Sequence, residues 1–214
     1  MNTDNMNRRQ LLQSLVLSTG ACAVVAFAAA PEPSAPALEE QTSWPYRTLG
    51  PERTANLAYQ LHIQKSSCMY GVFASIVNQL ADEVGGPYRT FPCDMMVYGE
   101  GGVADWGTLC GTLNGGAAVI SLLVRKPAER RALIDELFQW YQSTKLPAFV
   151  PAKTSFSGTL PAVEPGSVLC HPSATGWVKH AKVSYYGPER KERCHRLSAD
   201  TARKTAELLN RSFN

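Results

Sequence analysis

The sequence predicts an all-α, irregular helical domain with long loops, placed after an N-terminal signal segment. Three observations predict this class. Apolar residues recur at steps of three or four in several segments, which is the period of an amphipathic helix. No segment shows the apolar–polar alternation that is typical of a half-buried strand. Proline and glycine stand where these periodic segments begin and end.

The first thirty residues have the pattern of a twin-arginine (Tat) export signal, residues 1–30. Arg8 and Arg9 supply positive charge, residues 14–30 are uncharged and rich in Ala and Val, and residues 26–28 read Ala-Phe-Ala, a small-x-small cleavage pattern. A permanent anchor is the alternative, but the stretch is short and only moderately hydrophobic. We therefore expect a periplasmic or otherwise extracytoplasmic protein whose signal segment meets the membrane only transiently.

Residues 31–50 begin with a Pro-, Ala- and Glu-rich run and are predicted to be a flexible leader. Residues 51–214 are numerous enough for one domain with its own core. The chain has a formal net charge of +3, and its basic residues are interspersed among acidic ones. Nucleic acid is therefore a disfavoured partner, because proteins that bind it gather basic residues in a patch or stripe.

The first predicted helix spans residues 51–84. It opens with Pro51, a residue that is favourable at the first helical position, and its apolar residues fall at steps of four or near multiples. These residues are Leu61, Cys68, Val72, Ile76 and Leu80. Residues 85–87, Gly-Gly-Pro, end the helix. Residues 88–105 have few periodic apolar residues and several glycines, so we expect an irregular loop with a functional role.

The second predicted helix, residues 106–124, carries Gly107, Gly111 and Gly115 on one stripe. Glycine costs a helix roughly 1 kcal/mol relative to alanine. Three glycines at steps of four therefore indicate that a neighbouring helix or a flat cofactor lies close to this face.

The remaining segments are predicted as two helices and a loop. A third helix begins at Pro127 and ends before residues 146–147, Leu-Pro. Residues 147–169 lack periodicity and form a connecting loop. A last helix runs over residues 188–209, with Ser198 as a candidate break because serine is a good N-cap.

Five of the six cysteines lie beyond the signal segment. Cys68, Cys110 and Cys194 each fall on the apolar stripe of a different predicted helix, and Cys170 stands at the end of a loop. Four thiols from four segments can converge in one interior, where buried thiolates need a metal to neutralise them. Two other interpretations stay open: disulfides or redox thiols, and inert core residues. Cys93 is a spare thiol or an alternative ligand.

Several blocks of the sequence resemble the split-Soret cytochrome c group, within the broader redox-active family named for a Cys, Gly-Cys-Ala-x-x-Gly, Cys, Cys pattern. The most specific block is Trp-Gly-Thr-Leu-Cys-Gly-Thr-Leu-Asn-Gly at residues 106–115, followed by Leu-Cys-His at 169–171 and Arg-Cys at 193–194. The resemblance implies an extracytoplasmic electron-transfer protein, with an iron–sulfur or other non-haem iron site held by the scattered cysteines. It also implies a homodimer, as in the split-Soret members.

Two departures from the family pattern concern the cofactor. Covalent haem c needs Cys-x-x-Cys-His, and this chain has no such motif. The central block also has Cys-Gly where the family pattern has Gly-Cys-Ala. We therefore expect an iron–sulfur cluster bound by four cysteines, with haem as a secondary candidate. The predicted ligands are Cys68, Cys110, Cys170 and Cys194.

Two histidines are candidate cofactor-binding residues, because His171 and His195 each directly follow a predicted ligand cysteine. Each can donate a hydrogen bond to a ligand sulfur or serve as an axial ligand to a non-covalent haem. The alternative for each is a surface or capping histidine. His62 and His180 flank the same regions and are expected to face solvent.

Trp106 and Gly111 complete the candidate cofactor-binding residues. An aromatic side chain at Trp106 can exclude water from a redox centre, although it, Tyr98 and Trp177 can equally be core residues. Gly111 directly follows Cys110 on the glycine stripe, where it lets a cofactor approach the backbone.

These observations favour an exported electron carrier that acts on a redox partner protein rather than a catalyst. Neither a Gly-x-Ser-x-Gly elbow nor a phosphate-binding loop occurs, so a hydrolase or nucleotide-dependent enzyme is disfavoured. The alternative is an exported thiol–disulfide protein, or a structural partner-binding subunit, without a metal.

Overall fold

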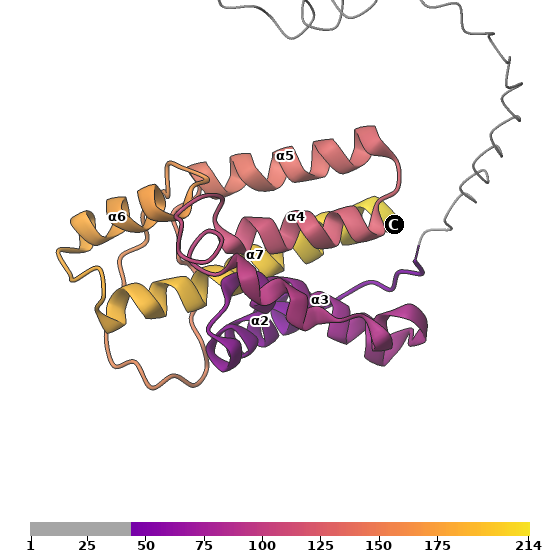
Figure 1. The fold of residues 1–214 in the computed structure, drawn as a ribbon, viewed down its shortest axis with the longest axis horizontal. Helices are drawn as coiled ribbons and strands as arrows, with labels where there is room; N and C mark the ends of the chain where they lie inside the picture. The colour runs from indigo at the N-terminus through magenta and orange to yellow at the C-terminus, as the bar shows by residue number, and fades with distance from the viewer. Residues whose placement is uncertain (1–43) are drawn as a thin grey trace, which may run out of the picture. The chain divides into compact units, whose positions relative to one another are not determined.

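The computed structural model describes residues 44–214, which form an all-helical domain and confirm the predicted class (Figure 1). The predicted signal, residues 1–30, lies outside the described residues. The elements are α2 (Pro51–Lys65), α3 (Cys68–Glu83), η1 (Gly86–Thr90), η2 (Cys93–Gly99), α4 (Gly111–Leu123), α5 (Pro127–Ser143), α6 (Cys170–Ala181) and α7 (Pro188–Phe213), where η marks a 3-10 helix. Within this part of the chain, no helix combines the length and apolar character needed to cross a membrane.

The single helix predicted for residues 51–84 is wrong, because the chain breaks it into α2 and α3. Ser66 adopts a left-handed conformation with φ of 53°, which ends α2. Ser67 then caps α3 by accepting a hydrogen bond from the Tyr70 backbone N–H at 3.3 Å. The apolar period continues across the break, since four of the five predicted face residues lie within α3. The break places Cys68 at the first position of a helix.

The second and last predicted helices also differ from the structure. Helix α4 begins at Gly111 rather than at residue 106. Residues 101–106 form turns and a bend, and the Cys110 N–H donates to Val168 O at 2.8 Å instead of joining a helix. Helix α7 runs without a break through Ser198. That side chain donates to the carbonyl of Cys194, one turn earlier, at 3.3 Å, so it does not cap a new helix.

Helix α6 is absent from our prediction, which recognised only the loop before it. Its sequence contains Pro172 and Gly176, residues that weaken a helical pattern. Pro172 is tolerated because it occupies the first turn, where backbone N–H groups lack intrahelical partners. The third predicted helix is confirmed by α5, whose face toward the core carries Leu133, Leu137 and Tyr141.

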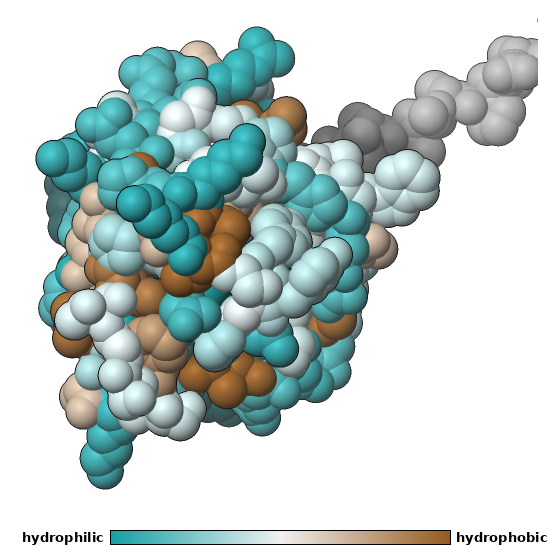
Figure 2. Space-filling model, turned by 90° about the vertical axis from the view of Figure 1, so that its left-hand side faces the viewer, coloured by the Kyte–Doolittle hydropathy of each residue, from teal (hydrophilic) through white to brown (hydrophobic). Residues whose placement is uncertain are grey.

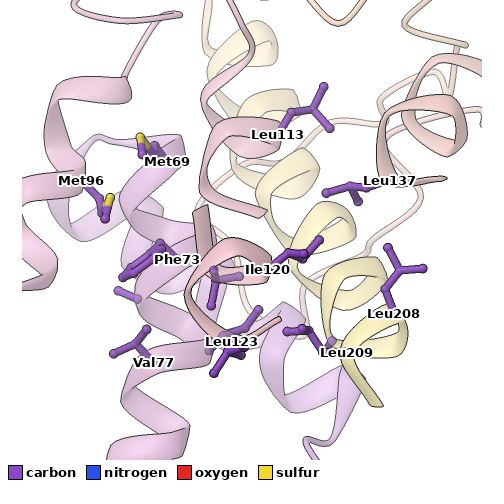
Figure 3. Packing of buried hydrophobic residues seen from close by; sticks show 14 of the residues in the cluster. Met69, Phe73, Val77, Met96, Leu113, Ile120, Leu123, Leu137, Leu208 and Leu209 are labelled. Carbon is purple, nitrogen blue, oxygen red and sulfur yellow. The ribbon is translucent and has the colours of Figure 1, made fainter. Parts of the chain in front are cut away.

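The main core lies between α3, α4, α5 and α7 (Figure 3). Its fully buried members include Phe73, Ile120, Leu137, Leu208 and Leu209. Complete burial of one such side chain contributes about 1.5–3 kcal/mol. This core fixes the directions of the four helices and thereby positions their ends.

Residues 44–50, which we expected within the leader, pack against the domain. Leu49 is 1% exposed. Its backbone N–H donates to Asn210 Oδ1 at 2.9 Å, and the Tyr46 hydroxyl donates to the same oxygen at 2.7 Å. Asn210 therefore ties the segment before α2 to the last turns of α7.

Candidate metal centre

The four predicted ligand cysteines line one cavity of about 450 Å³, although they come from four distant segments. Cys68 and Cys170 are the first residues of α3 and α6, Cys110 immediately precedes α4, and Cys194 lies in the second turn of α7. Helix α6 and the first turns of α7, which carry Cys170 and Cys194, lie at one end of the domain (Figure 1), and Figure 2 shows the surface of that end. The predicted convergence of thiols is therefore observed.

Three of these cysteines stand at helix N-termini, which is favourable for sulfur anions. Unpaired backbone N–H groups give the start of a helix a partial positive charge. This charge favours the thiolate over the thiol, and the thiolate is the form that binds metals. Helices α3, α4 and α6 therefore each direct a favourable potential toward a predicted ligand.

A short antiparallel contact holds two of the cysteines in place. Leu109 pairs with Leu169 as an isolated bridge. The Cys110 N–H donates to Val168 O at 2.8 Å, and the Cys170 N–H donates to Thr108 O at 2.7 Å. The two cysteines thus begin their helices from adjacent, hydrogen-bonded strand-like segments.

Glycines let the segments around the cavity approach closely. A Cβ at Gly111 would overlap the Sγ atom of Cys68, and one at Gly107 would overlap the ring of His171. A Cβ at Gly102 would lie 2.7 Å from the Cβ of Cys170. The glycine stripe is therefore explained by contact with side chains of α3 and α6, although Gly107 precedes α4 rather than belonging to it.

The turn at residues 101–105 has left-handed backbone conformation throughout, with φ between 46° and 75°. Three of its residues are not glycine, namely Val103, Ala104 and Asp105, and each such residue costs roughly 1–2 kcal/mol. Hydrogen bonds from the N–H groups of Gly107 and Thr108 back into the turn hold it, at 3.0 and 3.1 Å. Strain of this kind is typical of functional sites, and here it places Asp105 on the cavity wall.

Thiol electrostatics distinguish this cluster from inert core cysteines. Burial raises the pKa of Cys68 well above its ordinary value, and the charges of the other three thiols raise it further. Burial, followed by the charges of Cys110 and Cys194, raises the pKa of Cys170 to about 12. The thiolate forms of these cysteines would repel one another. Positive charge in the cavity is therefore needed to stabilise them.

Two arginines bring positive charge to the cavity. Arg193 is 2% exposed, its Nη1 lies 4.0 Å from Cys194 Sγ, and its Nε has no hydrogen-bond partner among residues 44–214. Burial lowers the pKa of Arg193, but the charges of Tyr141, Cys194 and Cys110 outweigh it, so the net pKa is raised. Arg190 Nη1 also lies 4.0 Å from Cys194 Sγ. The site therefore pairs thiols with guanidinium groups.

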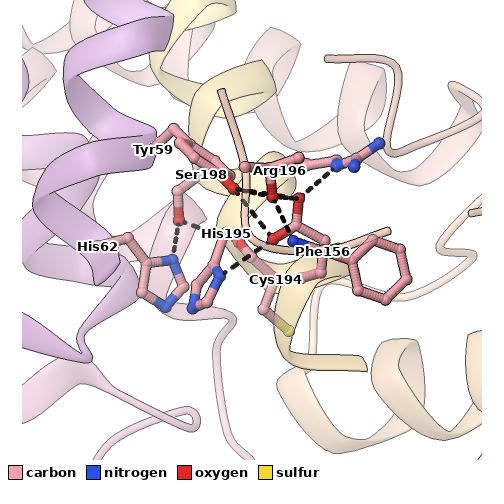
Figure 4. A network of polar contacts seen from close by, with 9 residues as sticks. Tyr59, His62, Phe156, Cys194, His195, Arg196 and Ser198 are labelled. Carbon is pink, nitrogen blue, oxygen red and sulfur yellow. Dashed lines mark hydrogen bonds and ion pairs between the residues drawn. The ribbon is translucent and has the colours of Figure 1, made fainter. Parts of the chain in front are cut away.

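Two histidines line the cavity beside Cys194, and both are oriented through Nδ1 (Figure 4). The Nδ1 atom of His195 lies 3.5 Å from Glu192 Oε2, and that of His62 lies 2.8 Å from Ser198 Oγ. The two rings are nearly perpendicular, with centroids 4.7 Å apart. A histidine anchored through one ring nitrogen presents the other in a defined direction.

The acidic partner of His195 is itself buried and held by several groups. Glu192 is 5% exposed and accepts hydrogen bonds from the Tyr59 hydroxyl at 3.1 Å and from Arg196 Nε at 2.7 Å. Burial lowers the pKa of His195, and Glu192 partly opposes the shift. Burial also lowers the pKa of His62 to about 3, so that its imidazole is neutral at pH 7. Our expectation that His62 faces solvent is wrong, since it is 6% exposed.

The other predicted cofactor-binding residues are placed less centrally. His171 is half-buried, with its ring against Gly107 and 6.1 Å from that of Tyr185, and it is not among the residues that line the cavity. Trp106 is 81% exposed and is also outside the lining, so the expected water-excluding or core role is wrong. Tyr98 is likewise exposed. Gly111 is also outside the lining, but it packs against Cys68, which belongs to the lining.

Cys93 lies outside the cavity, in η2. Burial and the neighbouring Asp94 raise its pKa to about 11. The five cysteines of residues 44–214 are all free thiols. Within this range, no three His, Cys, Asp or Glu side chains are arranged to hold an ion directly.

The sequence did not identify three residues that lie at the site: His62, Arg193 and Tyr141. Arg193 directly precedes a predicted ligand, which is a signal that could have been used. Tyr141 shares a helical stripe with Leu137 and therefore looks like an ordinary core aromatic. Nothing in the sequence brings His62 to Cys194, because their proximity depends on the packing of α2 against α7.

Comparison with known proteins gives a curated relative and a solved structure. The chain is 41% identical over 170 residues to the split-Soret cytochrome c of Desulfovibrio desulfuricans (strain ATCC 27774 / DSM 6949 / MB). The match covers 78% of this chain and 61% of the relative, so the chain spans about three fifths of that protein's length. The structure described as "A novel iron centre in the split-Soret cytochrome c from Desulfovibrio desulfuricans ATCC 27774" matches with a TM-score of 0.76 and 40% identity, over 79% of this chain and 72% of that one.

This comparison contradicts our expectation of an iron–sulfur cluster as the cofactor. The similar protein is a cytochrome c, hence a haem protein, and its iron centre is described as novel. The error has a physical reason. Thiolates gathered from four segments suit several soft metal centres, so the ligand set alone cannot select among them.

The family is established by a match that covers residues 70–208 and therefore includes Cys110, Cys170 and Cys194. The family is described as "Putative redox-active protein (C_GCAxxG_C_C)". Cys68 lies two residues before the matched range and joins the same cavity. The chain is a member of the C_GCAxxG_C_C family of redox-active proteins.

Proposed function

We propose that this chain is an exported electron carrier in which Cys68, Cys110, Cys170 and Cys194 bind an iron centre. The observation that carries the proposal is the convergence of these four thiols on one cavity beside a buried guanidinium group. The similar cytochrome also supports the proposal, because its solved structure is described as having a novel iron centre.

The residues of the cavity fit such a centre. Thiolates are suitable ligands for iron in redox proteins. The unpartnered Nε of buried Arg193 and the helix N-termini would balance thiolate charge. When bound, iron supplies a one-electron redox couple. The chain's own residues ligate, compensate charge and exclude water, the last through buried Leu197 on the cavity wall.

Covalent haem is not part of the proposal, because the chain has no Cys-x-x-Cys-His motif. Electron transfer is proposed because thiols and guanidinium groups line the cavity and the matching family is described as redox-active. As partners we propose a redox protein and a second copy of this chain.

The proposal is tested by iron analysis of anaerobically purified protein. We expect iron and a visible chromophore in the wild type, and loss of both in each of the variants C68S, C110S, C170S and C194S. The matched control is C93S, which changes a cysteine outside the cavity and should retain iron. Iron retained in all four variants would overturn the proposal. A metal-free wild type with disulfide-linked cysteines would instead support the thiol–disulfide alternative.

Export is tested separately on the full chain. Replacing Arg8 and Arg9 with lysine should leave the precursor in the cytoplasm, because the Tat route reads this pair. Equal extracytoplasmic amounts of the R8K/R9K variant and the wild type would contradict Tat export.

A further inference from the structure

We infer that a directed chain of hydrogen bonds from Arg193 through Ser173 and Tyr141 ends on the Cys110 sulfur and raises the reduction potential of the iron centre. The inference rests on the proposed iron site. It assigns to Tyr141 and Ser173 a positioning role that acts through a ligand sulfur.

Each link of this chain has hydrogen-bonding geometry and is buried. Arg193 Nη2 lies 2.7 Å from Ser173 Oγ. Ser173 Oγ lies 3.1 Å from the Tyr141 hydroxyl, which lies 3.4 Å from Cys110 Sγ. Tyr141 is 0%, Ser173 1% and Arg193 2% exposed. Three helices, α5, α6 and α7, thus each contribute one member.

The direction of the chain follows from the chemistry of its two ends. A guanidinium group only donates, so Ser173 Oγ must accept from Arg193. A ligand thiolate only accepts, so Tyr141 must donate its single proton to Cys110. Ser173 then has one proton left, and the Tyr141 oxygen is the acceptor within reach. Every donor therefore points from the guanidinium group toward the sulfur.

A chain with one direction strengthens its last bond. Each hydrogen bond polarises the next, and the effect is larger in a water-free interior. Hydrogen bonds to ligand sulfurs withdraw electron density and tune the potential of an iron site. Because they stabilise the more negative, reduced state, their effect is to raise the potential.

Cys110 differs from the other three thiols because hydroxyl groups lie within hydrogen-bonding distance of its sulfur. The first is that of Tyr141. Thr112 Oγ1 also lies 3.3 Å from its sulfur and must donate to a thiolate. Within residues 44–214, no hydroxyl group hydrogen-bonds to the other three sulfurs: Cys68 contacts the carbonyl of Gly99, and Cys194 contacts only guanidinium nitrogens, at 4.0 Å. Within the described residues, Cys110 is therefore the thiol whose sulfur is tuned through hydroxyl donors.

The test compares Y141F, S173A and the double variant with the wild type. Phenylalanine keeps the buried ring and removes only the hydroxyl group. We expect unchanged iron content and a lower midpoint potential in both single variants, and a double variant that matches Y141F alone, since Ser173 acts through Tyr141. The control is Y88F, because Tyr88 is equally buried but donates to the carbonyl of Pro45. Its potential should equal that of the wild type.

An iron-loaded Y141F with the wild-type potential, or shifts in the single variants that simply add in the double variant, would overturn the inference. A second measurement does not depend on iron. In the metal-free chain, urea unfolding should show that the stability loss of the double variant is smaller than the sum of the two single losses. Additive losses would show that the hydrogen-bond chain does not exist, whereas an iron-free wild type would overturn only the proposed function.

Discussion

The two halves of α7 bury side chains of opposite character. Its last turns bury Ala206, Leu208 and Leu209 in the apolar core (Figure 3). Its first turns bury Glu192, which is 5% exposed, and Arg193, which is 2% exposed and lines the cysteine cavity. The buried residues of the apolar half are stabilised by packing, whereas those of the polar half need specific partners from α2 and α6. A single helix thus joins the apolar core to the cysteine cavity.

The largest expected effect comes from removing a buried charge in the polar half. Glu192→Ala leaves Arg196 without its carboxylate partner and His195 without its orienting group. Loss of one partner of a buried pair costs about 3–5 kcal/mol. Urea unfolding of the metal-free chain should show this loss, and a change below about 1 kcal/mol would contradict the structural role of the pair.

A cavity in the apolar half should cost slightly less and leave the site intact. Leu208→Ala removes a fully buried side chain and should lower the free energy of unfolding by about 2–5 kcal/mol. Because no part of Leu208 lines the cysteine cavity, iron content of the folded protein should not change. Loss of iron from a folded L208A protein would show that the two halves are coupled.

His62 of α2, which packs against the polar half of α7, should also make stability depend on pH. The pKa of His62 is about 3 in the folded chain and near 6.5 when unfolded. Between these values the unfolded chain binds the additional proton, so stability is lost as pH falls, by up to about 1.4 kcal/mol per pH unit. His62→Asn keeps a hydrogen-bonding group toward Ser198 and does not titrate. The slope of unfolding free energy against pH should therefore be steeper in the wild type, and equal slopes would contradict the burial of a neutral imidazole.

The smallest effect is expected for an exposed ion pair far from the site. Glu136 pairs with Arg211 and Lys204, and the hydrogen bond from Arg211 is the main reason that its pKa is lowered. Glu136→Gln should cost less than about 1 kcal/mol, because solvent and salt screen such pairs. A loss comparable to that of E192A would remove the distinction between exposed and buried charges on which the comparison rests.

The same contrast explains what sequence reasoning could predict. Periodic apolar residues identified α5 and α7, and they placed Cys68, Cys110 and Cys194 on inward faces. The polar partners of the cysteines could not be predicted, because segments distant in the sequence decide their burial. Tyr141, for example, meets Cys110 only through the packing of α5 on α4. Local backbone conformation could not be predicted either. The apolar pattern is continuous across Ser66, but the left-handed conformation of this one residue ends α2. Cofactor identity failed for a different reason, because several metal centres accept the same ligands.

Iron K-edge X-ray absorption on the anaerobically purified wild type tests the central claim most directly. Iron held by Cys68, Cys110, Cys170 and Cys194 should show a first coordination shell dominated by sulfur, and C93S should give the same spectrum. The C110S variant should lose the iron or show fewer sulfur neighbours. A first shell of nitrogen and oxygen alone, in a wild type that contains iron, would contradict the four-cysteine centre.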